Sequence, residues 1–214
     1  MLPALLLVQA LAAALPTLGQ SADRIRLTEC IAAVDRDAEA GYETARQWIK
    51  EAHVREAYVC AALADVARDK PAQAARQFES LAVDAPEASE RANLLSQAGN
   101  AWLLARDPVR AREAFDKALQ SAANEPDLLI DRARAAAMLG QWRAAEEDLS
   151  AALDARPKDA LALRLRAEAR LQLGVFELAE KDATESVSAD PKNVESLVAL
   201  GRAREARRTG KTPD

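Results

Sequence analysis

Aromatic residues, glycine, proline, cysteine and histidine are all scarce in this sequence of 214 residues. Aromatics make up 4%, and the chain has 7 glycines, 9 prolines, 2 cysteines and 1 histidine. These shortages argue against a β-sandwich, which needs aromatic and β-branched residues and many turns, and against collagen and low-complexity disorder. Alanine takes the place of the missing residues: 51 alanines, together with leucine, arginine and glutamate, predict a helical chain.

An excess of positive charge is also lacking. The formal net charge is −5 at pH 7, whereas a general nucleic-acid binder is expected to be basic. We therefore expect no nucleic-acid partner, and a cationic binding site would stand out against the acidic whole.

The residue patterns of enzymes are missing as well. His53 is the only histidine, and its place just before a predicted helix indicates a solvated turn residue rather than a catalytic base. The sequence has no nucleophile elbow and no phosphate-binding glycine loop. Two cysteines without a CxxC spacing and one histidine do not make a zinc site. We expect a protein that is not an enzyme, with no cofactor and no bound metal.

The only long apolar run lies at the N-terminus. Residues 2–18 carry no charge, and the run ends at Pro16. A helix of about 12 apolar residues rises roughly 18 Å, less than the hydrocarbon core of about 30 Å. We interpret residues 1–19 as a secretory signal peptide, with a cut between positions 19 and 22, although no lysine or arginine precedes the run. The alternatives are an uncleaved membrane anchor and an ordinary buried helix. The first interpretation predicts a periplasmic or secreted protein.

The remaining chain repeats with a period of about 34 residues. Gly140 recurs as Gly174, and Pro157 recurs as Pro191. Farther upstream the step is slightly longer, and the loop at residues 84–87 accommodates the extra length. Small residues at one repeat position are expected to allow close helix contacts, and these are Gly99, Ala133, Ala167 and Gly201.

Each repeat has the pattern of two helices and a tight turn. Between residues 127 and 158, apolar residues recur at helical spacing on either side of Gly140, which suits a left-handed helix cap. Six first helices are predicted to begin near residues 23, 54, 92, 127, 160 and 194. Five of them have a second helix, and the last, residues 194–208, is a single capping helix. Residues 209–214 are expected to be a disordered tail.

Cys30 and Cys60 fall in the first helices of the first two repeats. Their number is even outside the signal peptide, and exported compartments are oxidising. We predict a disulfide between them. The alternative is that both are small buried hydrophobic residues.

Over residues 23–208 the chain resembles the tetratricopeptide repeat (TPR) family. The segments that carry the resemblance are AGNAWLLARDPVRAREAFDKAL, residues 98–119, and AMLGQWRAAEEDLSAALDARP, residues 137–157. The layout is also similar to exported alphaproteobacterial repeat proteins with a pair of cysteines in the first unit. The resemblance implies an all-α, right-handed superhelical solenoid of about five helix–turn–helix hairpins plus the C-terminal capping helix.

The resemblance also implies a function and a site. TPR proteins are interaction scaffolds, so we expect a non-catalytic scaffold that binds a protein or peptide, with a membrane-tethered assembly factor as the alternative if the N-terminus is not cleaved. In this family the first helices line a concave groove. The residues expected to face the partner there are Asn93, Ser96, Asn100, Ile130, Arg134, Arg164 and Glu168. Arg134 and Arg164 are the candidate anchors for a carboxylate, since arginine binds carboxylates bidentately. The alternative is that these arginines only pair with acids of the groove itself, Glu168 or Asp131.

Overall fold

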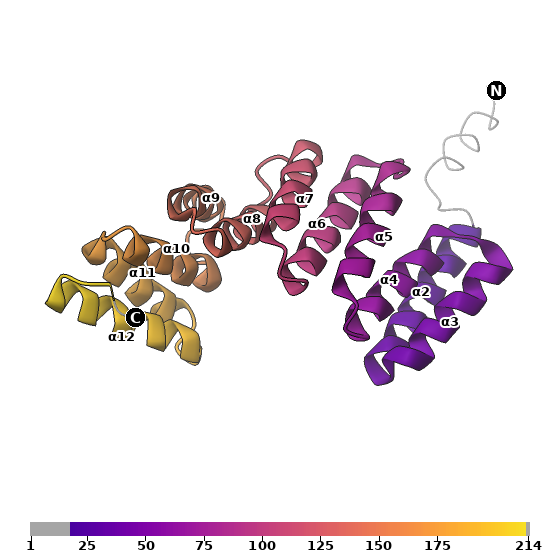
Figure 1. Ribbon diagram of the computed structural model, residues 1–214, viewed down its shortest axis with the longest axis horizontal. Helices are drawn as coiled ribbons and strands as arrows, with labels where there is room; N and C mark the ends of the chain where they lie inside the picture. Colours follow the sequence, from indigo (N-terminus) through magenta and orange to yellow (C-terminus); the bar gives the residue numbers. More distant parts are fainter. Residues whose placement is uncertain (1–17, 213–214) are drawn as a thin grey trace, which may run out of the picture. The chain divides into compact units, whose positions relative to one another are not determined.

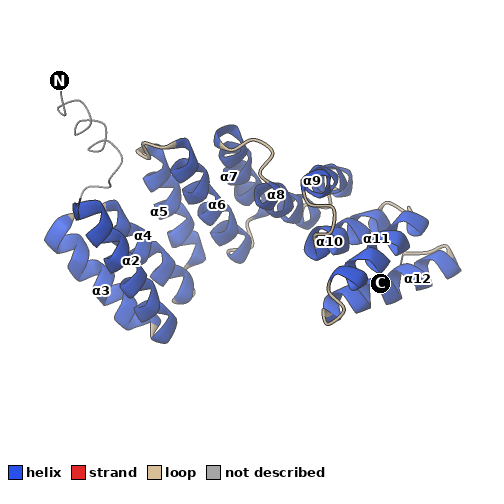
Figure 2. Cartoon of the chain, turned by 180° about the vertical axis from the view of Figure 1, so that it is seen from behind, coloured by secondary structure: helices blue, strands red, loops and turns tan. Residues whose placement is uncertain are grey.

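Residues 18–212 are described in a computed structural model, and this part of the chain contains eleven helices and no strand (Figures 1 and 2). Most of the expected signal peptide therefore lies outside the described residues, and the expected cut falls in the first turn of the first helix. The helices are α2 (Leu18–Arg36), α3 (Ala38–Ala52), α4 (Arg55–Ala67), α5 (Pro71–Val83), α6 (Ala88–Leu104), α7 (Pro108–Ser121), α8 (Pro126–Met138), α9 (Trp142–Ala155), α10 (Ala160–Gln172), α11 (Phe176–Ala189) and α12 (Val194–Thr209).

The chain divides into two compact units, and the boundary falls within α5, after Gln77. In the first unit, α2, α3 and α4 pack around a core that includes Trp48, Cys30 and Cys60. The sulfur atoms of the two cysteines lie at bonding distance, and their Cα atoms are 6.2 Å apart. The predicted disulfide would therefore link α2 to α4 across the core of this unit.

A buried carboxylate also stabilises the first unit. Asp65 of α4 is fully buried. It accepts hydrogen bonds from Arg68 at 3.0 Å, from Gln73 at 2.8 Å and from Gln77 at 3.0 Å. These contacts satisfy its oxygens away from water, and they connect α4 to the start of α5.

After the end of α5, the second unit consists of the hairpins α6–α7, α8–α9 and α10–α11, followed by the single helix α12, which packs on α10 and α11. The helices predicted to begin near residues 54, 127, 160 and 194 begin at Arg55, Pro126, Ala160 and Val194, whereas those predicted near residues 23 and 92 begin earlier, at Leu18 and Ala88. Side chains cap three of the helices in this unit. Asp107 accepts a hydrogen bond from the Arg110 amide, and Asp159 and Asn193 cap α10 and α12 in the same way. Gly140 has a φ of 70°, the left-handed conformation that its position in the turn requires.

Close helix contact in the first of these hairpins depends on Gly99. A Cβ atom placed there would lie 2.5 Å from a ring carbon of Phe115 in α7, so only glycine fits. The same expectation for Gly201 was wrong. A Cβ atom at Gly201 would meet nothing within 4 Å, because no second helix follows α12 among the described residues.

Ion pairs repeat with the hairpins of the second unit. Arg132 of α8 donates to Asp148 of α9, and one repeat later Arg166 of α10 donates to Asp182 of α11. The hydrogen bond to Asp148 raises the pKa of Arg132 above its ordinary value. The predicted all-α array of helical hairpins with a terminal single helix is confirmed.

Candidate functional site

The residues predicted to face a partner fall into two clusters in the second unit. One cluster lies on α6 and α8 and includes Asn100 and Arg134. The other lies on α10 and α12 and includes Arg164 and Glu168. On α6, Asn93 is exposed and Ser96 is half-buried. Ile130 of α8 is buried in the core with Leu129 and Ala133, so its side chain offers almost no surface to a ligand.

In the first cluster the arginine is already engaged. Arg134 donates to the carboxylate of Asp131 at 2.8 Å and reaches the Asn100 side-chain oxygen at 3.4 Å. The Asn100 amide in turn donates to Asp131 at 2.9 Å. A ligand carboxylate at Arg134 would have to compete with this internal carboxylate, which makes Arg134 a weak anchor.

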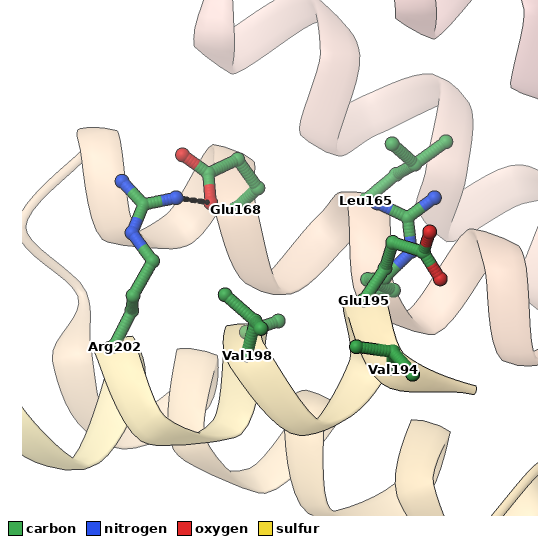
Figure 3. A pocket seen from close by; sticks show the side chains of 8 residues that line it. Leu165, Glu168, Val194, Glu195, Val198 and Arg202 are labelled. Atoms are coloured by element: carbon green, nitrogen blue, oxygen red, sulfur yellow. Dashed lines mark hydrogen bonds and ion pairs between the residues drawn. The ribbon is translucent and has the colours of Figure 1, made fainter. Parts of the chain in front are cut away.

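The second cluster surrounds a hollow of about 350 Å³ between α10 and α12. Figure 3 shows Arg202 reaching from α12 to Glu168 of α10, and the two side chains form an ion pair of 2.7 Å. The apolar part of the lining comes from Leu165, Val194 and Val198. The hollow therefore combines charged groups with apolar contact surface, as ligand sites generally do.

Arg164 differs from the other arginines of this groove. Its Nε atom is buried and has no hydrogen-bond partner, and its guanidinium forms no ion pair with an acid within residues 18–212. Glu195 lines the same hollow. A buried donor without an acceptor is destabilising, typically by about 1 to 3 kcal/mol. A carboxylate or carbonyl entering the hollow would supply the missing acceptor.

The two candidate anchors, Arg134 and Arg164, belong to different clusters. The hollow at Arg164 also contains apolar residues that the sequence reasoning did not select. Val194 and Val198 are one helical turn apart in α12, and this spacing of two exposed valines was the signal that could have identified them.

His53 belongs to the first unit, where it ends α3 in the left-handed conformation with an exposed side chain. Its Nδ1 lies 3.4 Å from the Tyr58 hydroxyl. No group of three or more His, Cys, Asp or Glu residues within 18–212 is placed to hold a metal ion. No helix in the same range has the length and hydrophobicity needed to cross a membrane.

Comparison with protein-family models and with curated proteins gives no match. Solved structures are similar. The first TPR domain of Spaghetti (RPAP3), bound to the HSP90 peptide SRMEEVD, matches 56% of this chain and 96% of its own length, with 26% identity and a TM-score of 0.55. MamA from Desulfovibrio magneticus RS-1 matches 72% of this chain and 85% of its own, with 23% identity and a TM-score of 0.64.

YrrB, described as a TPR protein with an unusual peptide-binding site, matches 80% of this chain and 87% of its own length, with 15% identity and a TM-score of 0.65. All three are TPR proteins, and the matches extend over most of each of them. This chain has the TPR fold.

Proposed function

We propose that the protein is a non-catalytic interaction scaffold that binds an extended segment of a partner protein in the hollow between α10 and α12. The single observation that carries the proposal is Arg164, which has no acid partner within residues 18–212 and lies at an apolar-lined surface. The ligand that fits is a peptide with a carboxylate for Arg164 and an aliphatic side chain for Leu165, Val194 and Val198.

The structural neighbours support this class of ligand. RPAP3 is bound to the peptide SRMEEVD, which contains three acidic side chains and two apolar ones. YrrB is described by its peptide-binding site. In this chain the arginine would interact with the carboxylate as a charge-assisted pair, the strongest type of hydrogen-bonded contact available to it.

Glu195 sets the selectivity of the hollow. It is the lining acid that has no ion-pair partner within residues 18–212, since Glu168 is paired with Arg202. A ligand carboxylate at Arg164 is repelled by Glu195, whereas a peptide N–H or a lysine beside that carboxylate is attracted to it. The best ligand is therefore an acidic–aliphatic segment with a hydrogen-bond donor next to the acid, rather than a run of acids.

Synthetic peptide arrays test the proposal. Short peptides that vary the spacing of Asp or Glu from Val or Leu are screened, and affinities are measured for the best of them. Replacing Arg164→Gln should weaken binding at least roughly tenfold, since a charge-assisted bond is worth about 1.5 to 3 kcal/mol. The matched control Arg134→Gln should change affinity less than about threefold, because that side chain is exposed and already paired.

Two outcomes would contradict the proposal. One is equal loss of affinity in Arg164→Gln and Arg134→Gln. The other is equal binding of peptides in which Asp and Glu are replaced by Asn and Gln. The variant Glu195→Gln adds a test of sign: it should tighten the binding of acidic peptides by a few-fold, because it removes a competing negative charge.

We also propose that the scaffold acts outside the cytoplasm, in the periplasm, as a released protein with its cysteines oxidised. The uncharged N-terminal run and the even cysteine count support this, and the placement of Cys30 and Cys60 at bonding distance is compatible with it. The mass of the mature chain isolated from cells tests the proposal. Loss of the N-terminal segment up to the predicted cut supports release, whereas full mass in a membrane fraction supports the tethered alternative.

A further inference from the structure

The outer face of α12 repeats a surface that every preceding hairpin of the second unit buries. One repeat position is occupied four times by leucine: Leu95 in α6, Leu129 in α8, Leu163 in α10 and Leu197 in α12. The first three are 6%, 6% and 2% exposed, whereas Leu197 is 48% exposed. The difference follows the architecture, because α6, α8 and α10 are each followed by a second helix, and α12 is not within the described residues.

The glycine four residues after this leucine shows the same difference in packing between α6 and α12. Gly99 in α6 is in contact with Phe115 of α7, whereas the equivalent Gly201 in α12 faces open space. Gly201 lies one turn after Leu197, so the two residues are on the same face of α12. This face has the shape that receives a large side chain from a second helix.

The charge at the end of this face indicates which side chain a helix bound there would present. Arg170 of α10 contacts two acids, Glu146 of the preceding second helix at 2.9 Å and Asp182 of the following second helix at 2.6 Å. Its equivalent in the next repeat is Arg204 of α12. Arg204 has the first contact, with Glu180 at 3.6 Å.

No acid in the position of Asp182 is present for Arg204 within the described residues. The side chain of Arg204 is accordingly 62% exposed, compared with 13% for Arg170. Leu197, Gly201 and Arg204 together thus form a face that is apolar at one end and cationic at the other. None of these three residues lines the hollow at Arg164, so the face is a second surface.

We propose that this face of α12 binds an acidic amphipathic helix of a partner protein. The bound helix places a large apolar side chain over Gly201 beside Leu197 and a carboxylate on Arg204. The charge pattern favours such a helix: the chain's own second helices in the last two hairpins, α9 and α11, each carry an excess of acidic residues, with Asp148 and Asp182 at the position in question.

The chain itself supplies the probe for a test. A peptide with the sequence of α9, WRAAEEDLSAALDA, contains Asp148, the equivalent of Asp182, and Leu149, the equivalent of Phe115. It is amidated and acetylated, and its binding to the full protein is followed by the chemical shifts of α12 residues. A second peptide with Leu149→Phe should bind more tightly by a few-fold, because Gly201 leaves the same room that Phe115 fills at Gly99.

Three protein variants define the site. Leu197→Glu should weaken binding of the peptide roughly tenfold or more, since burial of a leucine is lost. Val109→Glu, at a similarly exposed valine of α7, is the matched control and should change affinity less than about twofold. Arg204→Gln should weaken binding of the Asp148 peptide but not of the same peptide with Asp148→Asn, which isolates the ion pair in a double-mutant cycle.

The proposal is supported if the α9 peptide binds saturably and Leu197→Glu abolishes that binding. The melting temperature, and the binding of acidic–aliphatic peptides to the hollow between α10 and α12, should stay unchanged in this variant. Absence of saturable binding, or binding that Leu197→Glu leaves intact, would overturn it. So would a doubled mass of the unliganded protein that Leu197→Glu returns to the monomer, because the face would then belong to a second copy of the chain. Arg164→Gln changes only the hollow between α10 and α12. Failure of the proposed function can therefore be distinguished from failure of the proposal for the outer face of α12.

Discussion

The two units of this chain are stabilised in different ways. The second unit repeats its contacts: the same Arg–Asp pair joins both helices of two successive hairpins. The first unit depends instead on a cysteine pair and on a buried Asp65 held by neutral and charged donors. Within the described residues, α2 has no preceding repeat beside it, and a disulfide between Cys30 and Cys60 would compensate for the contacts that such a neighbour supplies.

The first prediction concerns the largest expected effect, at the cysteine pair. Replacing Cys30 and Cys60 together by alanine should destabilise the first unit by about 3 to 4 kcal/mol, because the disulfide closes a loop with a sequence separation of 30. Hydrogen exchange followed residue by residue should show faster opening of α2 to α4 and unchanged protection from α8 to α12. Titration of two free thiols in the purified, non-reduced protein would show that no disulfide forms.

The second prediction concerns the repeated ion pairs. Asp182 is buried and accepts hydrogen bonds from Arg166 and Arg170. Replacing Asp182→Ala leaves Arg166 without its acid and Arg170 with Glu146 alone, and it should cost about 3 kcal/mol in the free energy of unfolding of the second unit. Replacing Asp116→Ala removes an exposed partner of Arg132 and should cost less than about 1 kcal/mol. Urea midpoints that rank these variants the other way would mean that the buried pairs do not hold the hairpins together.

The third prediction concerns helix contact in the α6–α7 hairpin. Gly99→Leu forces side-chain atoms against Phe115 and should cost about 1 to 3 kcal/mol or more. Gly201→Leu, at the same repeat position, should have little steric cost, because nothing lies within 4 Å of its Cβ position. Arg134→Ala is a surface change of about 0.5 kcal/mol. Equal melting temperatures for the two glycine variants would contradict the close contact between Gly99 and Phe115.

The fold was predictable because its determinants are local. Gly140, Asp107 and Asp159 act within one turn of where they stand in the sequence, and the repeat period aligns them. Gly201 shows the limit of this reasoning. Its position in the repeat is the same as that of Gly99, but its packing depends on whether a second helix follows, which the repeat phase alone does not encode.

The site was predictable only in part. The helices that form the groove follow from the repeat, and Arg164 and Glu168 do border the hollow. Which arginine lacks a partner could not be predicted, because that depends on whether an acid from another element lies within reach. Asp131 lies three residues before Arg134 on the same helix, and Arg202 reaches Glu168 from α12, whereas no acid within residues 18–212 reaches Arg164.

The fourth prediction has the smallest expected effect, and it is a gain in stability where the earlier ones are losses. Arg164→Met keeps much of the length of the side chain and removes the buried donor that has no acceptor within residues 18–212. We expect it to stabilise the second unit by about 1 kcal/mol, measured by urea unfolding, while it reduces partner binding. A loss of stability would mean that Arg164 has a structural role, and would remove the argument that it is held for a ligand.

The most direct test of the central claim is site-specific photo-crosslinking in the native cells. A photoreactive amino acid is placed at Val198, which lines the hollow, and at Val109 as an exposed control outside it. The account predicts a partner protein crosslinked at Val198 and not at Val109, through a segment that contains an acid beside aliphatic residues, and loss of that product in the Arg164→Gln background. Capture of the same partner at Val198 with undiminished yield in Arg164→Gln would contradict it.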